Sequence, residues 1–217
     1  MRMLRRLAER LRKRSSFRDG RICAITLGIA VLPLLAFMPG GGAQPPPSIA
    51  TIVEFNTVCS DCHAGECSGR LSFDSGPAAA RSHIERYLGN THEVPIAALF
   101  AMLRHVKETC SHYPMVPLRP ATGSWAAAEL APWRNARAGA YFIPLGRLAA
   151  GRRHLSLEFD RPAEGNAQID DERMQTVADE RLCRDMTKTV ALDATTTATY
   201  FLHLKSGAAI LSRITFR

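Results

Sequence analysis

Apolar residues recur at two different spacings along this chain, and the spacing changes near its middle. In the first half, residues 49–58 and 95–109 place their apolar side chains on one helical face. Residues 77–88 begin with a proline and are followed by glycine, which is the usual punctuation of a helix. Residues 113–123 contain three prolines and cannot continue a helix. The first half therefore predicts three short helices.

In the second half the apolar residues alternate with a period of two, which is typical of strands. The alternation is clearest in residues 154–160 and 199–205. Phe201 breaks the second pattern, which indicates either an exposed apolar patch or a sheet covered on both faces. Residues 161–165 and 206–207 are predicted turns. Weaker strand candidates are residues 140–148, 167–169, 187–192 and 210–216.

Together these patterns predict an α+β protein with two domains. A small helical domain would span about residues 48–120, and an antiparallel β-sandwich would span about residues 138–217. Six short strands at intervals of about ten residues favour the sandwich.

The first 43 residues predict an export signal or a membrane anchor. Residues 1–21 carry a net charge of +7, and residues 22–38 carry no charge. Gly41 and Ala43 are small residues that suit a signal cleavage site. As a helix, residues 22–38 would reach about 25 Å, barely the thickness of a bilayer, so cleavage and retention as a tether both stay open. Either outcome places residues 44–217 outside the cytoplasm, in the periplasm of a bacterium.

The net charge of +8 resides almost entirely in this leader. From Gln44 onward there are 19 basic and 18 acidic residues, which excludes the clustered charge of a nucleic-acid-binding domain. The exported part has an odd number of cysteines, so at least one has a role other than pairing in a disulfide. These are Cys59, Cys62, Cys67, Cys110 and Cys183.

Residues 59–63 read CSDCH, and this spacing is typical of covalent haem attachment. Two thiols three residues apart on a helical turn can reach the two vinyl groups of a haem, and His63 can bind the iron from the proximal side. On this motif, and on Phe55 four residues before Cys59, the segment resembles the class I c-type cytochromes over about residues 49–120. The resemblance implies one covalent haem c and transfer of single electrons.

Three other uses of the motif compete with haem attachment. A zinc knot of Cys59, Cys62, His63 and Cys67 lacks the two separated ligand pairs of most structural zinc sites. A thioredoxin-like pair needs a βαβ context that the pattern does not show. A disulfide between Cys59 and Cys62 leaves His63 without a role. We therefore interpret the motif as a haem site.

The distal iron ligand is less well defined by the sequence. The resemblance implies a methionine downstream, commonly beside proline, and Met115 lies 52 residues after His63. The strongest predicted helix precedes Met115 rather than following it, which makes His83 a rival. His105, His112 and an open position are further alternatives. A methionine ligand suits an electron carrier, and an open position suits a haem enzyme or a redox or gas sensor.

The remaining residues point to no catalytic chemistry. There is no nucleophile elbow, no phosphate-binding loop and no evident acid–base pair, and residues 170–172 (DDE) are interpreted as a solvated turn. We expect Cys67 and Cys110 to form a disulfide, which would stabilise the helical half by a few kcal/mol.

The favoured function is a periplasmic cytochrome that docks a redox partner protein through its β domain, with no small-molecule substrate. Alternatives are a haem enzyme or sensor and a non-haem binding protein with a zinc or disulfide knot.

Overall fold

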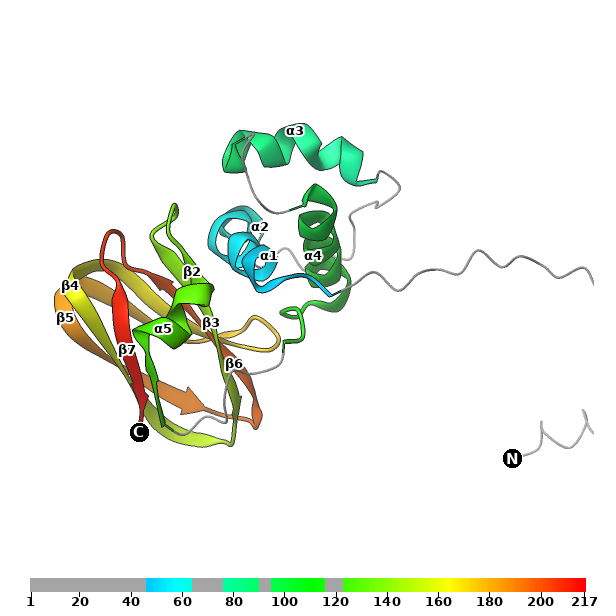
Figure 1. The fold of residues 1–217 in the computed structure, drawn as a ribbon. Coiled ribbons are helices and arrows are strands. Elements are labelled where there is room, and N and C mark those ends of the chain that lie inside the picture. Colours follow the sequence, from blue (N-terminus) through cyan, green and yellow to red (C-terminus); the bar gives the residue numbers. More distant parts are fainter. Residues whose placement is uncertain (1–45, 64–75, 90–94, 116–122) are drawn as a thin grey trace, which may run out of the picture. The chain divides into compact units, whose positions relative to one another are not determined.

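The helices come first along the chain and the strands follow. The computed structural model describes residues 46–63, 76–89, 95–115 and 123–217. The described residues all belong to one compact unit (Figure 1). Its helical elements are α1 Ile49–Glu54, the π-helix η1 Phe55–Cys59, α2 Ser60–His63, α3 Pro77–Leu88 and α4 Ile96–Thr109, followed later by α5 Ala127–Leu130 and the 3-10 helix η2 Ala131–Trp133.

The strands form one seven-stranded antiparallel sheet among the described residues. Its order is β1-β7-β4-β6-β3-β2, and β5 pairs with β4. The strands are β1 Gly123–Ala126, β2 Arg134–Asn135, β3 Ala140–Leu148, β4 Gly151–Asp171, β5 Thr176–Ala194, β6 Ala198–Lys205 and β7 Leu211–Phe216.

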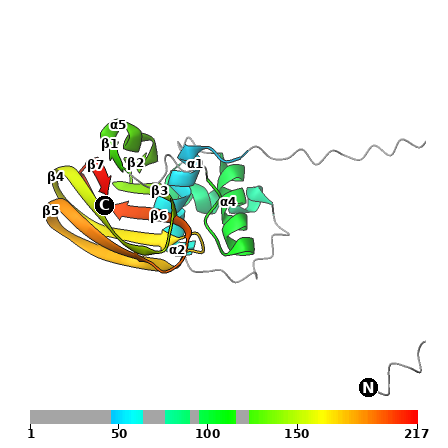
Figure 2. The same cartoon turned by 90° about the horizontal axis from the view of Figure 1, so that it is seen from below.

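The long hairpin of β4 and β5 joins the strands into this single sheet. β5 pairs with β4 over nearly its whole length, so β7 and β6 must share the other edge of β4. Residues 155–159 of β4 pair with β7, and residues 166–171 pair with β6. The register shifts between Glu158 and Ala163, where an irregular strand can bend. Figure 2 shows how strongly the hairpin and the sheet curve.

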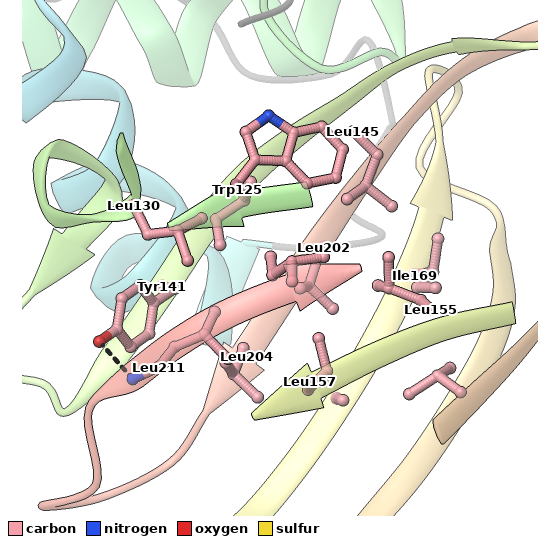
Figure 3. Close-up of a cluster of buried hydrophobic side chains, with 14 of the residues drawn as sticks. Trp125, Leu130, Tyr141, Leu145, Leu155, Leu157, Ile169, Leu202, Leu204 and Leu211 are labelled. Carbon is pink, nitrogen blue, oxygen red and sulfur yellow. Dashed lines mark hydrogen bonds between the residues drawn. The ribbon is translucent and has the colours of Figure 1, made fainter. Parts of the chain in front are cut away.

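The main hydrophobic core lies on one face of this curved sheet (Figure 3). The two tryptophans, Trp125 and Trp133, are buried in it, as we expect for packing residues rather than for a sugar-binding surface. The hydroxyl of Tyr141 accepts a hydrogen bond of 2.9 Å from the backbone N–H of Leu211, which satisfies a polar group inside the core. Strand side chains that Figure 3 labels in this core are Leu145, Leu155, Leu157, Ile169, Leu202 and Leu204.

A second core joins the helices to the opposite face of the sheet. Side chains alternate between faces along a strand, so Phe142 of β3 and Phe201 of β6 point away from the main core. Both are fully buried, and their rings are parallel within 3° with centroids 5.5 Å apart. They share this core with apolar residues of α1, η1, α3 and α4, which are Ile52, Phe55, Ile84, Leu88, Leu99, Met102 and Val106.

The predicted fold class, a small helical cytochrome domain followed by an antiparallel β-sandwich, is wrong. The structure is dominated by one curved antiparallel sheet, and the helices have no separate core because Phe142 and Phe201 complete it. Alternation in the sequence shows which residues share a face of a strand. It does not show whether two groups of strands form separate sheets or are joined by one long, bent hairpin.

Most individual elements lie where the pattern places them. The helices predicted at 77–88 and 95–109 correspond to α3 and α4, and the strand predicted at 140–148 corresponds to β3. The predicted turn at residues 161–165 is wrong, because these residues lie within β4. The predicted leader, residues 1–43, lies outside the described residues. Among the described helices, none has the length and apolar character needed to cross a membrane.

Replacing Gly165 with alanine should lower the free energy of unfolding by about 1–3 kcal/mol more than replacing Gly151 with alanine. Both glycines have positive φ angles, +144° and +140°, so both variants carry backbone strain. A Cβ at Gly165 would lie 2.1 Å from the carbonyl oxygen of Lys205, whereas nothing lies within 4 Å of one at Gly151. Urea unfolding of the two variants measures the difference. Equal losses would contradict the close approach of β4 to β6.

Candidate functional site

The CSDCH motif lies at the end of a helix whose winding changes. The chain passes from α1 into the π-helix η1, and such single π turns often occur at functional sites. Three polar side chains bond to carbonyl oxygens four residues earlier: Asn56 to Ile52 (2.8 Å), Thr57 to Val53 (2.7 Å) and Ser60 to Asn56 (2.6 Å). Such side-chain bonds compete with the backbone hydrogen bonds of an α-helix and are consistent with the wider turn of the π-helix.

Polar contacts fix the motif against the sheet. The side-chain amide of Asn135 donates to the hydroxyl of Thr57 (2.9 Å) and to the carboxylate of Glu54 (3.1 Å). The ammonium group of Lys205 donates to both carboxylate oxygens of Asp61, at 2.9 and 3.0 Å. Asn135 is buried, whereas the Asp61–Lys205 pair is about half exposed. The amide therefore contributes more to holding the motif than the exposed ion pair does.

An apolar pocket opens beside the two cysteines of the motif. Cys59, Cys62 and His63 line it from η1 and α2, and His83 lines it from α3. The ring centroids of His63 and His83 are 6.0 Å apart. The other lining residues are apolar or aromatic and come from η1, α3 and α4: Phe55, Val58, Ala80, Ile84, Tyr87, Leu88, Leu99, Phe100 and Leu103.

The thiol of Cys59 lies in this apolar environment. Its pKa is raised from 9.0 to about 11, chiefly by burial and to a smaller extent by the nearby Glu54 and Cys62. Cys62 is exposed, and neither cysteine forms a disulfide. Both sulfurs are therefore available for another covalent bond at the pocket.

The structure separates the candidates for the distal iron ligand. His83 faces His63 in the pocket, whereas Met115 does not line it and packs between the two cores. His105 also lies elsewhere, since its ring contacts Thr109 and Tyr113. The arrangement brings together Cys59, Cys62, His63 and His83.

The other predicted cysteine roles concern Cys110 and Cys183. Cys110 is disulfide-bonded, and its predicted partner, Cys67, lies outside the described residues. The alternative interpretation as a zinc knot also included Cys67 as a ligand, so that ligand lies outside the described residues too. Cys183 is exposed and free.

A second cavity of about 390 Å³ lies on the side of η1 that faces the sheet. Its wall contains three residues whose ligating atoms all lie within 4.8 Å of one another: His112, Asp170 and His203. The Nε2 atom of His203 is 3.3 Å from Oδ2 of Asp170, and Nε2 of His112 is 4.0 Å from the same oxygen. His63 and Phe55 also line this cavity, so η1 and α2 border both pockets.

Sequence reasoning missed this cluster. Residues 170–172 were expected to form a solvated turn, but the Asp170 side chain is buried, with 5% of the residue exposed. His203 lies two residues after Phe201 and so shares its face of β6, which is the one signal that the sequence offered. The other residues that contact this face of β6 are determined by the helices packed against it, so the sequence pattern does not identify them.

Both histidine rings of the cluster are neutral near pH 7. The pKa of His112 is lowered to about 3, chiefly by burial and to a smaller extent by the neighbouring His203. Burial also lowers the pKa of His203, although the carboxylate of Asp170 acts in the opposite direction. Neutral rings keep a nitrogen lone pair, which is the form that binds metal ions.

Replacing Asn135 with alanine should lower the free energy of unfolding by about 1–3 kcal/mol, because buried polar groups of the motif helix lose their partner. The matched control, Lys205→Met, removes only the exposed contact to Asp61 and should cost less than about 1 kcal/mol. Urea unfolding monitored by circular dichroism measures both losses. An equal or larger loss in the control would show that the buried amide does not hold the motif.

In the folded, haem-free protein, Cys59 should react with iodoacetamide at pH 8 more slowly than in the unfolded chain. A pKa of about 11 instead of 9.0 reduces the thiolate fraction there by about 100-fold relative to the urea-unfolded chain. Because the folded-state pKa is raised, the thiol stabilises the fold fully below pH 9 and loses that contribution as the pH rises through about 11. Peptide mass spectrometry gives the rate at each pH. A rate equal to that of the unfolded chain would refute the burial of this thiol.

Sequence comparison supplies no further guide to these pockets. Neither a protein-family model nor a curated protein sequence matches this chain. The function is therefore inferred from two groups of residues: the thiols and imidazoles at the apolar pocket, and the His112–Asp170–His203 cluster on the other side of η1.

Proposed function

We propose that the chain binds one haem c covalently through Cys59 and Cys62 and carries single electrons. The observation that carries this proposal is the shared pocket: both thiols and two imidazoles line one apolar space. A haem is a large apolar group with two axial positions on its iron, and this set of side chains supplies both tethers and both axial ligands.

The spacing of the two imidazoles supports His83 as the distal ligand. Metal–nitrogen bonds of about 2 Å on each side of one ion give ring centres about 6 Å apart once the ring radii are added. The rings of His63 and His83 are separated by 6.0 Å. Met115, the distal ligand that the resemblance implied, does not line the pocket. We therefore assign His63 as the proximal and His83 as the distal ligand.

The size of the pocket sets one condition on binding. The space between the lining side chains is about 60 Å³. Sites for small organic ligands measure about 300–1,000 Å³, so α3 would have to move away from α2 and α4 to admit the porphyrin. The motif helix itself would stay in place, because Asn135 and Lys205 bond it to the sheet.

The protein residues have distinct roles in this proposal. Phe55, Ile84 and Leu99 exclude water from the site, and the low dielectric constant of their surroundings influences the reduction potential. The ring of Tyr87 lies 5.0 Å from that of His83 and limits its orientation. The haem supplies reversible uptake of one electron at its iron. With His63 and His83 both binding the iron, the chain would favour electron transfer over catalysis.

Partner and location follow from the same chemistry. A carrier of single electrons needs a redox partner protein as donor or acceptor. In bacteria, haem is attached to such motifs outside the cytoplasm, which agrees with an exported or membrane-tethered chain. The sheet would act as the rigid support of the haem site, because its Phe142 and Phe201 belong to the core of the helices.

Full-length protein from a host with c-type haem maturation should carry one covalent haem per chain. A pyridine haemochrome spectrum and intact-protein mass spectrometry measure it. The double variant Cys59→Ala, Cys62→Ala should lose the covalent haem, and the control Cys183→Ser should keep it, since Cys183 is exposed and far from the motif in sequence. A wild-type chain without an added tetrapyrrole would refute the proposal.

The variant His83→Ala should change the iron from six-coordinate low spin to high spin, because it removes the distal imidazole. Met115→Ala should leave the spectrum unchanged, since Met115 does not line the pocket. Visible absorption and electron paramagnetic resonance of the haem-loaded proteins measure the spin state. The reverse result, with a methionine–iron charge-transfer band that Met115→Ala abolishes, would assign the distal ligand to Met115.

A further inference from the structure

The His112–Asp170–His203 cluster belongs to no part of the haem proposal. Its residues come from three separate places: the segment after α4, the end of β4, and β6. They converge on the cavity of about 390 Å³ between η1 and the sheet. Bringing three metal-binding side chains together from distant positions fixes their relative geometry through the fold itself.

The cluster contains buried polar atoms that the described part of the chain leaves without a partner. Asp170 and His112 are 5% and 6% exposed, respectively. Among the described residues, the groups that can form an ion pair with the Asp170 carboxylate are His112 and His203. The Nε2 atoms of His112 and His203 have no hydrogen-bond partner within the described part of the chain. A buried polar atom without a partner destabilises the fold, and a bound cation would satisfy both nitrogens and the carboxylate.

Neighbouring groups orient these side chains as outer-shell partners do in metal sites. The ring of His203 hydrogen-bonds to the backbone of Asn56, which leaves its Nε2 directed toward Asp170. The side-chain amide of Gln168 donates to both oxygens of Asp170, at 2.9 and 3.1 Å. A metal-bound histidine usually donates its second nitrogen to a carbonyl or carboxylate, and a ligating carboxylate is usually hydrogen-bonded.

We propose that His112, Asp170 and His203 bind one divalent transition metal ion of the zinc or ferrous-iron class. Two imidazoles and one carboxylate are a donor set that both ions accept, with at least one position left for water or substrate. Bonds of about 2.0–2.2 Å put tetrahedral ligand atoms about 3.4 Å apart. The distance of 3.3 Å between Nε2 of His203 and Oδ2 of Asp170 is close to this spacing. For a complete metal site, the ligating nitrogen of His112 must move closer to the other two ligand atoms by less than about 1.5 Å.

The open position would face the polar part of the cavity. Asn166, Gln168 and Thr176 line the wall next to Asp170, and His63 lines the same cavity from α2. A small polar ligand on the ion would therefore lie close to the motif helix. The metal site depends on the cluster alone and does not require a haem at the motif.

Zinc titration of the exported, full-length protein tests this proposal. After removal of metals by a chelator, isothermal titration calorimetry with Zn²⁺ should show one site per chain. His203→Gln and Asp170→Asn should weaken it by more than about 100-fold, because changes to outer-shell partners alone cost about 10- to 100-fold. His154→Ala, which removes an exposed histidine, should leave the affinity unchanged. Covalent haem is measured on each sample, so loss of haem and loss of zinc are read separately.

A second measurement guards against variants that fail to fold. Zinc should raise the melting temperature of the wild type and of His154→Ala but not that of Asp170→Asn. Without metal, Asp170→Asn should still show a cooperative melting transition, because asparagine keeps the shape of the side chain and removes a buried charge. Anaerobic competition with Fe²⁺ then shows which ion binds more tightly, and either order agrees with the proposal. No stoichiometric binding of either ion, or zinc binding that survives both ligand substitutions, would overturn it.

Discussion

The stacking of Phe142 on Phe201 is the contact on which the rest of this structure depends. These rings lie on the face of the sheet opposite the main core, and the helices cover them. Burying an aromatic side chain contributes about 1.5–3 kcal/mol, and an uncovered pair would leave an apolar patch on the sheet. The helices in turn lack enough apolar partners among themselves. Each layer therefore supplies part of the interior of the other, and the chain from Gln44 onward folds as one unit.

Local structure was largely predictable from the sequence, because periodicity and punctuation are local properties. The helix at residues 77–88 has a proline in its first turn and a glycine at its end, and both marks appear at α3. Topology was not predictable, because it depends on residues 158–163, where β4 shifts register and changes partners from β7 to β6. In the sequence, a bend inside a long strand cannot be distinguished from a turn between two strands. The prediction of a separate β-sandwich domain was wrong for this reason.

The candidate site was predictable only where its residues are close in sequence. Cys59, Cys62 and His63 form a motif with a known chemical use, so they could be named without a structure. His83 could be named only as a rival to Met115, and it is the packing of α3 against α4 that brings it opposite His63. The cluster of His112, Asp170 and His203 was hidden because Asp170 has an acidic, turn-like sequence context. The burial of Asp170 arises from tertiary packing alone.

The pairing of β5 with β4 leaves the outer edge of β5 unpaired within the described residues. Such an edge is a template on which a strand from another molecule can add, and proteins prevent this with charged side chains along it. β5 follows this rule: it carries charged side chains along its length, and a strand added at this edge would have to desolvate them. A long hairpin that holds the sheet together can therefore remain at its border without promoting aggregation. The residues that provide this protection are Asp179, Glu180, Arg181, Arg184, Asp185, Lys188 and Asp193.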